Sequence, residues 1–197
     1  MIRLKIVTNR KICKISLEEN LKRVLEKNLT KGFVVDSIVL REKDLSPEEY
    51  EALYIKIKEI TDYYGIKLFA HKNWNSKACM EGGRIHLSYN SFKNIVSSRI
   101  NREKFFEKYR EIGVSVHSVE DALMAENFGA TYVTFGHVFP TECKRGLEPR
   151  GMDKLREVCL SVDIPVFAIG GMDRENAEEA VECGAYGICI MSGIMKL

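Results

Sequence analysis

The fold is decided by a short stretch in which a buried strand runs straight into a helix start: residues 113–121, GVSVHSVED. Its first four residues are small or β-branched apolar residues apart from one serine, which suits a strand inside a sheet. Ser118 then stands before Val119-Glu120-Asp121, and a serine ahead of acidic residues is a typical helix N-cap. The stretch therefore predicts one β-then-α unit, with its strand at residues 113–116.

The same order recurs along the whole chain. Short apolar runs of a length suited to buried parallel strands lie at residues 4–8, 37–41, 67–70, 84–87, 113–116, 132–136, 166–169 and 187–191. Between them, Ser16, Ser46 and Asp173 resemble Ser118 as helix starts, and SPEE at residues 46–49 has the pattern of a capping box with proline in the first helical position. Helices are therefore expected after the first, second, fifth and seventh strands, and a helix after the third strand is expected to be short.

Eight such units favour a single-domain α/β fold over residues 1–197, a (β/α)8 TIM barrel. A doubly wound open sheet is the alternative, but no Gly-x-Gly-x-x-Gly follows the first strand. Six residues, 192–197, remain after the eighth strand, so the last helix is expected to be shortened. Because a neighbouring subunit would cover the flank left open, we expect a homo-oligomer, and specifically a dimer.

Composition and charge exclude several classes of protein. The 197 residues are 45% hydrophobic and 29% charged with a net charge of +2, which fits a globular protein and argues against a nucleic-acid binder. No run approaches the ~18 consecutive apolar residues of a membrane span, and no secretion signal is evident, so a cytoplasmic protein without membrane attachment is expected. The six cysteines form no Cys-x-x-Cys pair and are expected to be reduced, mostly buried thiols.

In a (β/α)8 barrel the active site lies at the carboxyl ends of the strands, so the residues where each apolar run stops are informative. Gly170 and Gly171 follow the seventh strand, and Ser192 and Gly193 follow the eighth. Glycine allows a ligand to approach the backbone closely, and free N–H groups at a helix start favour an anion. One such turn is equally well explained as a tight turn, whereas two adjacent turns favour a phosphate-binding site.

The long loop after the sixth strand carries the candidate catalytic residue, His137, with Thr141 and Lys144 beyond it. A histidine at the mouth of a barrel can take and return a proton near neutral pH, and its two companions can hold an anionic substrate. A structural histidine that bonds a backbone carbonyl is the alternative. The residues alone leave both interpretations open.

Further candidate substrate-binding residues end the fifth and second strands. Ser115 and His117 follow the fifth strand, and Arg41 and Lys43 follow the second, where they could hold a carboxylate or a phosphate. For the two cations, a solvated surface pair is an equal alternative. The other two histidines of the chain have no partnered pattern and are expected to be structural or solvent-facing, and residues 99–110 carry both signs of charge, as a solvated helix face does.

These segments resemble the thiamine phosphate synthase superfamily over nearly the whole chain. From residue 113 to residue 193 they are similar in detail to its TenI branch, the thiazole tautomerases. The motifs that carry the resemblance are GVSVHS at 113–118, FGHVF at 135–139 running on to Lys144, GLE at 146–148, RG at 150–151, AIGG at 168–171 and MSGI at 191–194, with weaker support from LREK at 40–43.

Departures from the synthase pattern favour the TenI branch. The synthases carry Asn-Asp-Arg after the third strand and an acidic residue after the fourth, which hold magnesium and the diphosphate of the pyrimidine substrate. The corresponding places here read HKN at 71–73 and SYN at 88–90. Magnesium prefers carboxylate oxygens, so these replacements argue against a metal-assisted displacement. His137 stands where the synthases have proline and the tautomerases have their catalytic histidine.

The resemblance therefore implies an isomerase of thiamine biosynthesis, a thiazole tautomerase that aromatises a thiazole carboxylate phosphate. It implies that His137 moves the proton, that Gly170, Gly171, Ser192 and Gly193 bind the phosphate, and that Ser115, Thr141 and Lys144 position the ring and carboxylate with help from Arg41. No metal or redox cofactor is expected. Two alternatives stay open: a thiamine phosphate synthase, a magnesium-dependent transferase that joins a pyrimidine diphosphate to the thiazole phosphate, and a non-catalytic regulator that binds the phosphate ligand.

Overall fold

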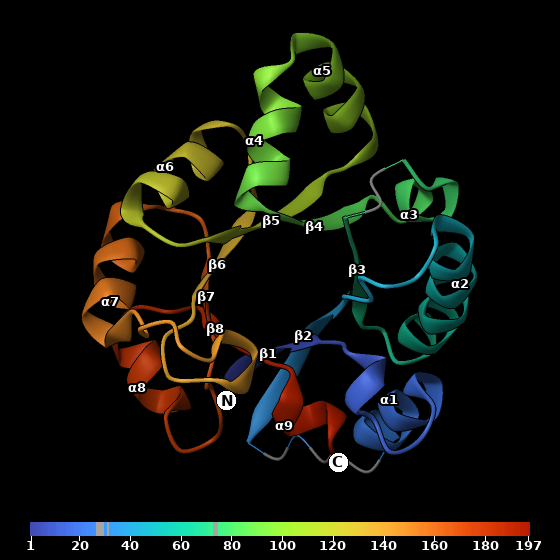
Figure 1. Ribbon diagram of the computed structural model, residues 1–197, viewed down its shortest axis with the longest axis horizontal. Helices are drawn as coiled ribbons and strands as arrows, with labels where there is room; N and C mark the ends of the chain where they lie inside the picture. The colour runs from blue at the N-terminus through green and yellow to red at the C-terminus, as the bar shows by residue number, and fades with distance from the viewer. Residues whose placement is uncertain (27–29, 31, 73–74) are drawn as a thin grey trace.

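Eight parallel strands close into a barrel in the computed structural model, which describes residues 1–26, 30, 32–72 and 75–197. Each strand pairs with its neighbours in sequence order, and β1 pairs with β8 to close the ring. The view down the barrel shows the strands as an inner ring with the helices around it (Figure 1). The expected (β/α)8 TIM barrel is confirmed, and the open sheet is excluded.

All eight strands overlap the stretches expected from the sequence. They are β1 (Ile2–Val7), β2 (Phe33–Leu40), β3 (Lys67–His71), β4 (Arg84–Ser88), β5 (Glu111–Val116), β6 (Tyr132–Gly136), β7 (Val166–Ile169) and β8 (Gly187–Ile190). The largest difference from the expected bounds is at β2, which begins at Phe33 rather than at residue 37. Its first half pairs with β1, and the side chains there are half-buried or exposed. The charged Asp36 separates the apolar residues 33–35 from the apolar run that begins at Ile38, so the first half of β2 does not read as part of one continuous strand.

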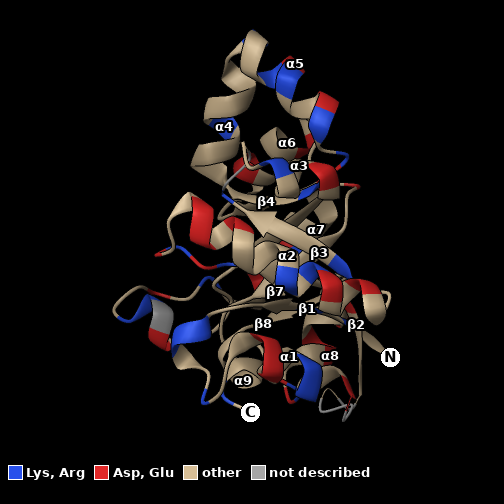
Figure 2. Ribbon diagram, turned by 90° about the vertical axis from the view of Figure 1, so that its right-hand side faces the viewer, with Lys and Arg blue, Asp and Glu red and all other residues tan. Residues whose placement is uncertain are grey.

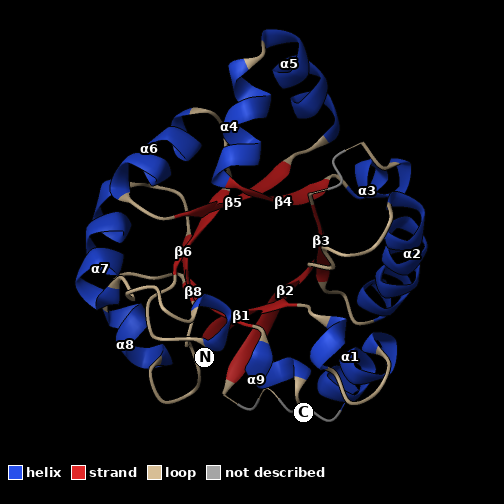
Figure 3. Ribbon diagram, in the orientation of Figure 1, coloured by secondary structure: helices blue, strands red, loops and turns tan. Residues whose placement is uncertain are grey.

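The helices form the outer layer of the barrel (Figure 3). They are α1 (Leu17–Glu26), α2 (Pro47–Tyr63), α3 (Lys77–Gly82), α4 (Tyr89–Ser97), α5 (Arg99–Lys108), α6 (Val119–Asn127), α7 (Gly151–Ser161), α8 (Ala177–Glu182) and α9 (Ser192–Met195), with 3-10 turns η1 (Arg10–Ile12) and η2 (Glu142–Lys144). The helix after β3 is short, and α9, with four residues, is the expected shortened last helix.

The helix starts follow the expected chemistry with one exception. Ser46 accepts the Glu49 N–H at 3.2 Å while the Glu49 carboxylate accepts the Ser46 N–H at 2.9 Å, which is the predicted capping box. Ser118 caps α6 in a similar way. Asp173 is not the cap of α8, because its carboxylate accepts the N–H groups of Glu175 and Asn176 in a turn and the helix begins only at Ala177.

The outer helices carry mixed charge. Acidic and basic residues lie together on α1, α2 and α5 in Figure 2. Most residues of α5 are exposed, which agrees with the solvated face expected for residues 99–110. Among the described helices, none is both long and apolar enough to cross a membrane.

The barrel interior contains a buried lysine. Lys5 is 1% exposed, and its Nζ lies 4.6, 4.2 and 4.5 Å from the ring centroids of Phe69, Tyr132 and Phe167. Burial lowers the pKa of Lys5, and its contact with the Asp36 carboxylate at 3.1 Å opposes that shift. The ammonium and the three rings therefore fill the centre of the barrel with a packed layer.

Candidate active site at the carboxyl ends of the strands

A cavity of about 500 Å³ opens at the carboxyl ends of the strands, and every strand or the loop after it contributes to its lining. Its floor includes Val7, Val39 and Cys189, which belong to the same buried cluster as the rings around Lys5. Lys5 stands two residues before Val7 on the same face of β1, so it lies one layer further from the mouth. The cavity is therefore floored by packed side chains.

All the site residues expected from the sequence line this cavity except Gly193: Arg41, Lys43, Ser115, His117, His137, Thr141, Lys144, Gly170, Gly171 and Ser192. Gly193 lies inside α9, where a Cβ would meet the Ile190 side chain at 3.1 Å. Gly193 is exposed on α9 and is not part of the cavity lining.

The turn after β7 meets the loop after β6 at backbone contact. Gly170 has a φ of +96°, and a Cβ there would lie 2.3 Å from the His137 Cβ; Gly171, with a φ of +67°, would place a Cβ 2.5 Å from the Phe139 Cβ. The Phe139 N–H also donates to the Gly170 carbonyl at 3.0 Å. Only glycine fits at either position, so the tight-turn explanation applies to both residues, and both also line the cavity.

Two predicted site histidines have backbone carbonyl partners. His137 is 4% exposed with its Nε2 3.3 Å from the Leu147 carbonyl oxygen, and the Nδ1 of His117 is 2.8 Å from the Gly136 carbonyl oxygen. The side chain and backbone N–H groups of Arg150 donate to the carbonyls of His117 and His137. Both rings thus make the contact expected of structural histidines while facing the cavity.

Four cationic side chains, Arg41, Lys43, Lys72 and Lys144, line the same cavity, and we call them the cationic cluster. Within the described part of the chain, none of the four takes part in an ion pair. Desolvation lowers the pKa of Lys43, and the positive charges of the other three members lower it further. Arg41 and Lys43 therefore belong to a larger group of positive charges that face the cavity, although Lys43 is also exposed to solvent.

Hydrogen bonds from α2 and β1 hold the loops that carry these cations. The buried Tyr50 hydroxyl donates to the Leu40 carbonyl at 2.7 Å and accepts the His71 N–H at 2.8 Å, which joins the ends of β2 and β3. The Arg41 N–H donates to the Thr8 hydroxyl at 2.9 Å. The residues that follow β2 and β3 are thereby fixed side by side at one edge of the cavity.

Two further histidines, His71 and His86, also line the cavity, which corrects the expectation that they are merely structural or solvent-facing. The His86 ring lies 2.9 Å from the Tyr132 hydroxyl and 2.8 Å from the Ser115 hydroxyl. Burial, followed by nearby positive charges that include Arg41, lowers the pKa of His71 to about 3, and burial also lowers the pKa of His86 well below its ordinary value. Both rings are therefore neutral at pH 7.

The signal that sequence reasoning missed for His86 is strand alternation. Residues 86 and 88 of β4 point to one face of the sheet, and Ser88 pairs in register with Ser115 of β5. Ser115 is a candidate site residue, so its paired neighbour Ser88 is expected to face the barrel interior too. His86, two residues before Ser88 on β4, then faces the same way.

The described residues that follow β3 and those at the junction of β4 with α4 do not provide a magnesium site. Lys72, Ser88 and Ser91 line the cavity there, and among the described residues no group of three or more His, Cys, Asp or Glu is arranged to hold a metal ion. Magnesium is bound in proteins chiefly through carboxylate oxygens. The residues present therefore do not fit this ion.

The fold and the site define a class of protein: a (β/α)8 barrel whose carboxyl-end cavity combines glycine turns after the last strands with a cationic rim. Comparison with known families identifies the family within this class. The family described as "Thiamine monophosphate synthase" matches residues 4–194, and the chain belongs to this family.

Individual relatives agree with the family. The thiamine-phosphate synthase of Clostridium acetobutylicum is 33% identical over 98% of this chain and 87% of its own length, and that of Clostridium tetani is 34% identical over 96% and 86%. Among solved structures, the thiamine phosphate pyrophosphorylase from Pyrococcus furiosus has a TM-score of 0.79 at 27% identity, covering 100% of this chain and 88% of the other. The resemblance to the thiamine phosphate synthase and TenI superfamily is thus confirmed.

The expectation of a thiazole tautomerase, and with it of an isomerase, is wrong. The relatives that match nearly the whole chain are named thiamine-phosphate synthase, which is a transferase. His137 and the missing acids are local departures from the synthase pattern, and the similarity to the synthases extends over nearly the whole chain. The catalytic role expected for His137 belongs to the tautomerase reaction, so we do not assign that role to it.

Proposed function

We propose that this chain is a transferase of the thiamine-phosphate-synthase type, which joins a pyrimidine diphosphate to a thiazole phosphate. The observation that carries the proposal is the presence of two separate regions suited to phosphate in one cavity: the turns with Gly170, Gly171 and Ser192, and the cationic cluster. A reaction between a monophosphate and a diphosphate needs two anion sites that face the same space. The synthase relatives over 96–98% of the chain support the same reaction.

In the proposed reaction the bond between the methylene carbon of the pyrimidine and the diphosphate oxygen breaks, and its electron pair leaves with the diphosphate. The thiazole nitrogen supplies the pair for the new C–N bond. No proton has to be removed, so the reaction needs no general base. This suits a site in which His71 and His86 are held neutral by burial and the other two histidines already have carbonyl partners.

We assign the phosphate of the thiazole to Gly170, Gly171 and Ser192, which offer backbone N–H groups and a hydroxyl. Ser115 lies deeper in the cavity lining, where His86 and the Thr134 hydroxyl hold its own hydroxyl at 2.8 and 3.2 Å, and we assign it to a ring nitrogen or amine of the pyrimidine. Thr141 and His117 complete the wall.

We assign binding of the diphosphate to Arg41, Lys43 and Lys144. No step is assigned to magnesium, because the side chains after β3 and β4 do not fit the ion. The absence of a resident cofactor, a dimer and a cytoplasmic location stay predictions.

The test is a direct assay of the purified chain with both substrates, in which thiamine phosphate and pyrophosphate are quantified together. We expect the two products in equal amounts. Ser192→Ala is expected to raise the KM for the thiazole phosphate and leave the KM for the pyrimidine diphosphate unchanged. Ser97→Ala, on the exposed face of α4, serves as the matched control. Failure to form thiamine phosphate with or without magnesium would contradict the proposal.

A second candidate, a non-catalytic protein that binds the thiazole phosphate, is favoured by Lys72 and Ser88, which lie in the stretches where the synthases have carboxylates. The same assay separates the two candidates. Tight binding of the thiazole phosphate by calorimetry, without release of pyrophosphate, would favour this second function.

A further inference from the structure

We propose that the cationic cluster binds a diphosphate directly, without a divalent metal ion. The inference rests on the proposed function for the identity of the anion, and it goes beyond that function in assigning the charge neutralisation to side chains of the protein. Three observations carry it: the charge of the cluster, the place of Lys72 and the shape of the cavity.

The charge of the cluster is uncompensated. The acidic residues that follow Arg41 and Lys43 have other partners: Glu42 accepts the Thr8 hydroxyl at 2.7 Å and the Arg10 guanidinium at 3.2 Å, and Asp44 pairs with Arg10 at 2.7 Å and with Lys11 at 3.2 Å. On the other flank, Glu142 pairs with Arg145 at 2.6 Å. Desolvation lowers the pKa of Lys43, and repulsion from the other three cations lowers it further. A bound polyanion would relieve this repulsion, so the cluster of the free protein favours binding of a polyanion.

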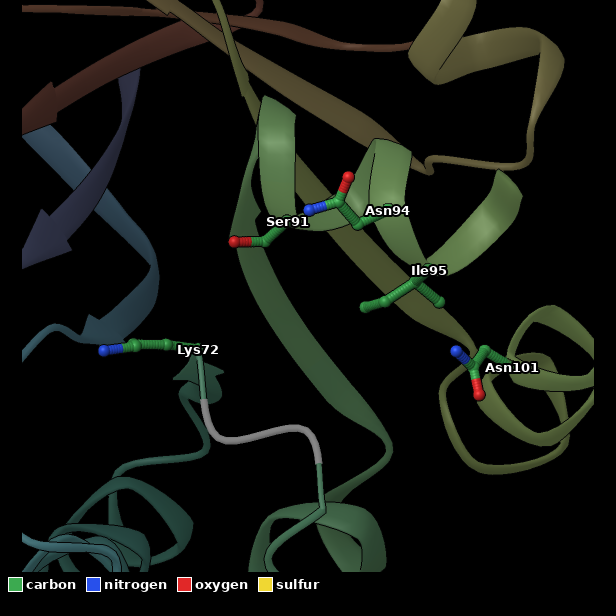
Figure 4. A pocket seen from close by; sticks show the side chains of 5 residues that line it. All are labelled: Lys72, Ser91, Asn94, Ile95 and Asn101. Atoms are coloured by element: carbon green, nitrogen blue, oxygen red, sulfur yellow. The ribbon is translucent and has the colours of Figure 1, made fainter. Parts of the chain in front are cut away.

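Lys72 stands in the loop that carries a magnesium-binding acid in the synthases. Its backbone has a φ of +74°, a conformation that residues other than glycine rarely adopt. Beside the main cavity lies a shallower hollow of about 290 Å³, lined by Lys72, Ser91, Asn94, Ile95 and Asn101. In Figure 4 the Lys72 side chain extends away from the last three of these residues, and it lines the main cavity as well.

This replacement changes how the diphosphate is neutralised. A carboxylate at this place would repel a diphosphate unless a divalent cation bridged the two. An ammonium attracts the diphosphate directly and brings its own hydrogen-bond donors. The same positive charge is thus supplied at the same edge of the cavity, but by the chain itself.

The cavity can accommodate both ligands of such a reaction. Arg41 and Lys43 follow β2, Lys72 follows β3 and Lys144 lies in the loop after β6, so the four cations approach from different parts of the rim. Arg41 offers a planar fork, and the lysines offer point charges. The volume of about 500 Å³ leaves the side with the glycine turns free for a second phosphate.

The experiment titrates the full-length chain with inorganic pyrophosphate by isothermal calorimetry, first in EDTA and then in excess magnesium. We expect saturable binding in EDTA, weaker binding at high salt because the charges are screened, and no gain on adding magnesium. Lys72→Gln is expected to lower the affinity about tenfold, a loss of about 1.4 kcal/mol. Lys77→Gln is the matched control, because Lys77 is exposed at the start of α3 and outside the cavity lining. Thermal unfolding of both variants checks that they fold.

The outcomes separate this inference from the proposed function. Pyrophosphate binding that appears only with magnesium, no binding in either condition, or an unchanged affinity in Lys72→Gln would each overturn the inference, even in a chain that makes thiamine phosphate. If the chain binds pyrophosphate in EDTA but makes no thiamine phosphate, the inference is supported and the proposed transferase function is contradicted. Lys72→Asp sharpens the test: we expect it to bind more weakly than Lys72→Gln in EDTA and to regain affinity with magnesium.

Discussion

The two sides of the cavity rim are built from different parts of the chain. After β7 the rim is backbone: Gly170 and Gly171 lie so close to the loop after β6 that a Cβ would collide with it. After β2 and β3 the rim is side chain: Arg41, Lys43 and Lys72 extend from loops with exposed or half-exposed residues. A backbone site is constrained by packing and cannot change without disturbing the barrel. A side-chain site can exchange a carboxylate and its metal for an ammonium while the fold stays the same.

The largest effect is expected from Gly170→Ala, which tests the backbone side. The added methyl group would lie 2.3 Å from the His137 Cβ at a φ of +96°. We expect the free energy of unfolding to fall by about 3 kcal/mol and the affinity for thiazole phosphate to fall about 100-fold. Chemical denaturation and calorimetry measure the two quantities.

Gly146→Ala is the matched control for Gly170→Ala. Gly146 also has a positive φ, +82°, but nothing lies within 4 Å of a Cβ built there. The substitution should therefore cost about 1 kcal/mol for the backbone conformation alone and leave the affinity unchanged. Equal losses in both variants would show that close packing is not what makes the β7 side intolerant.

Tyr50→Phe tests what holds the side-chain half of the rim in place. The substitution removes the hydroxyl that joins the Leu40 carbonyl to the His71 N–H and leaves both groups without that partner. We expect a loss of about 2 kcal/mol in the free energy of unfolding, measured by chemical denaturation. Tyr63→Phe, at an 83% exposed position on the same helix, should change stability by less than about 0.5 kcal/mol. A comparable loss in both would contradict the bridging role.

Lys43→Gln tests whether the rim is functionally divided. We expect the affinity for inorganic pyrophosphate to fall about tenfold, while the affinity for thiazole phosphate stays within about twofold. Lys11→Gln is the control, because Lys11 carries the same charge nearby but pairs with Asp44. If both ligands lose affinity equally in Lys43→Gln, the two sides of the rim do not act separately.

The smallest effect per unit of the variable changed concerns pH and the neutral histidines beneath the rim, at about 1 kcal/mol for each pH unit. The pKa of His86 is lowered in the folded protein, so the unfolded chain binds more protons below pH ~6.5, and stability is full above that pH and falls as the pH is lowered. We expect a slope on the order of 1 kcal/mol per pH unit between about pH 6 and 4 from this group, with His71 adding to it. His86→Gln should reduce the slope in denaturation curves. Parallel curves for the variant and the wild type would contradict this account.

The barrel could be predicted from the sequence because each strand is covered on both faces and so reads as a short apolar run. The failures lie where local chemistry has two solutions. Asp173 satisfies backbone N–H groups in a turn as readily as at a helix start, and only the following residues decide which forms. In β2, Asp36 interrupts the apolar sequence and separates residues 33–35 from residues 38–40, so the start of the strand is not evident from the sequence.

Much of the site could be placed in advance, because residues at strand ends must converge at one end of a barrel. What could not be seen is how they interact. Arg41, Lys72 and Lys144 are far apart in sequence, and their repulsion exists only once the loops after β2, β3 and β6 meet. The expectation of a tautomerase failed for a different reason: it depends on a single histidine, and the ring of that histidine lies against a carbonyl in the folded chain.

The ammonium of Lys5 and its three aromatic neighbours act as a plug beneath Val7 and Cys189. Because this packed layer closes the inner end of the cavity, ligands enter and leave only through its mouth. For the proposed reaction of two substrates, we expect the substrate that lies deeper in the cavity to bind first.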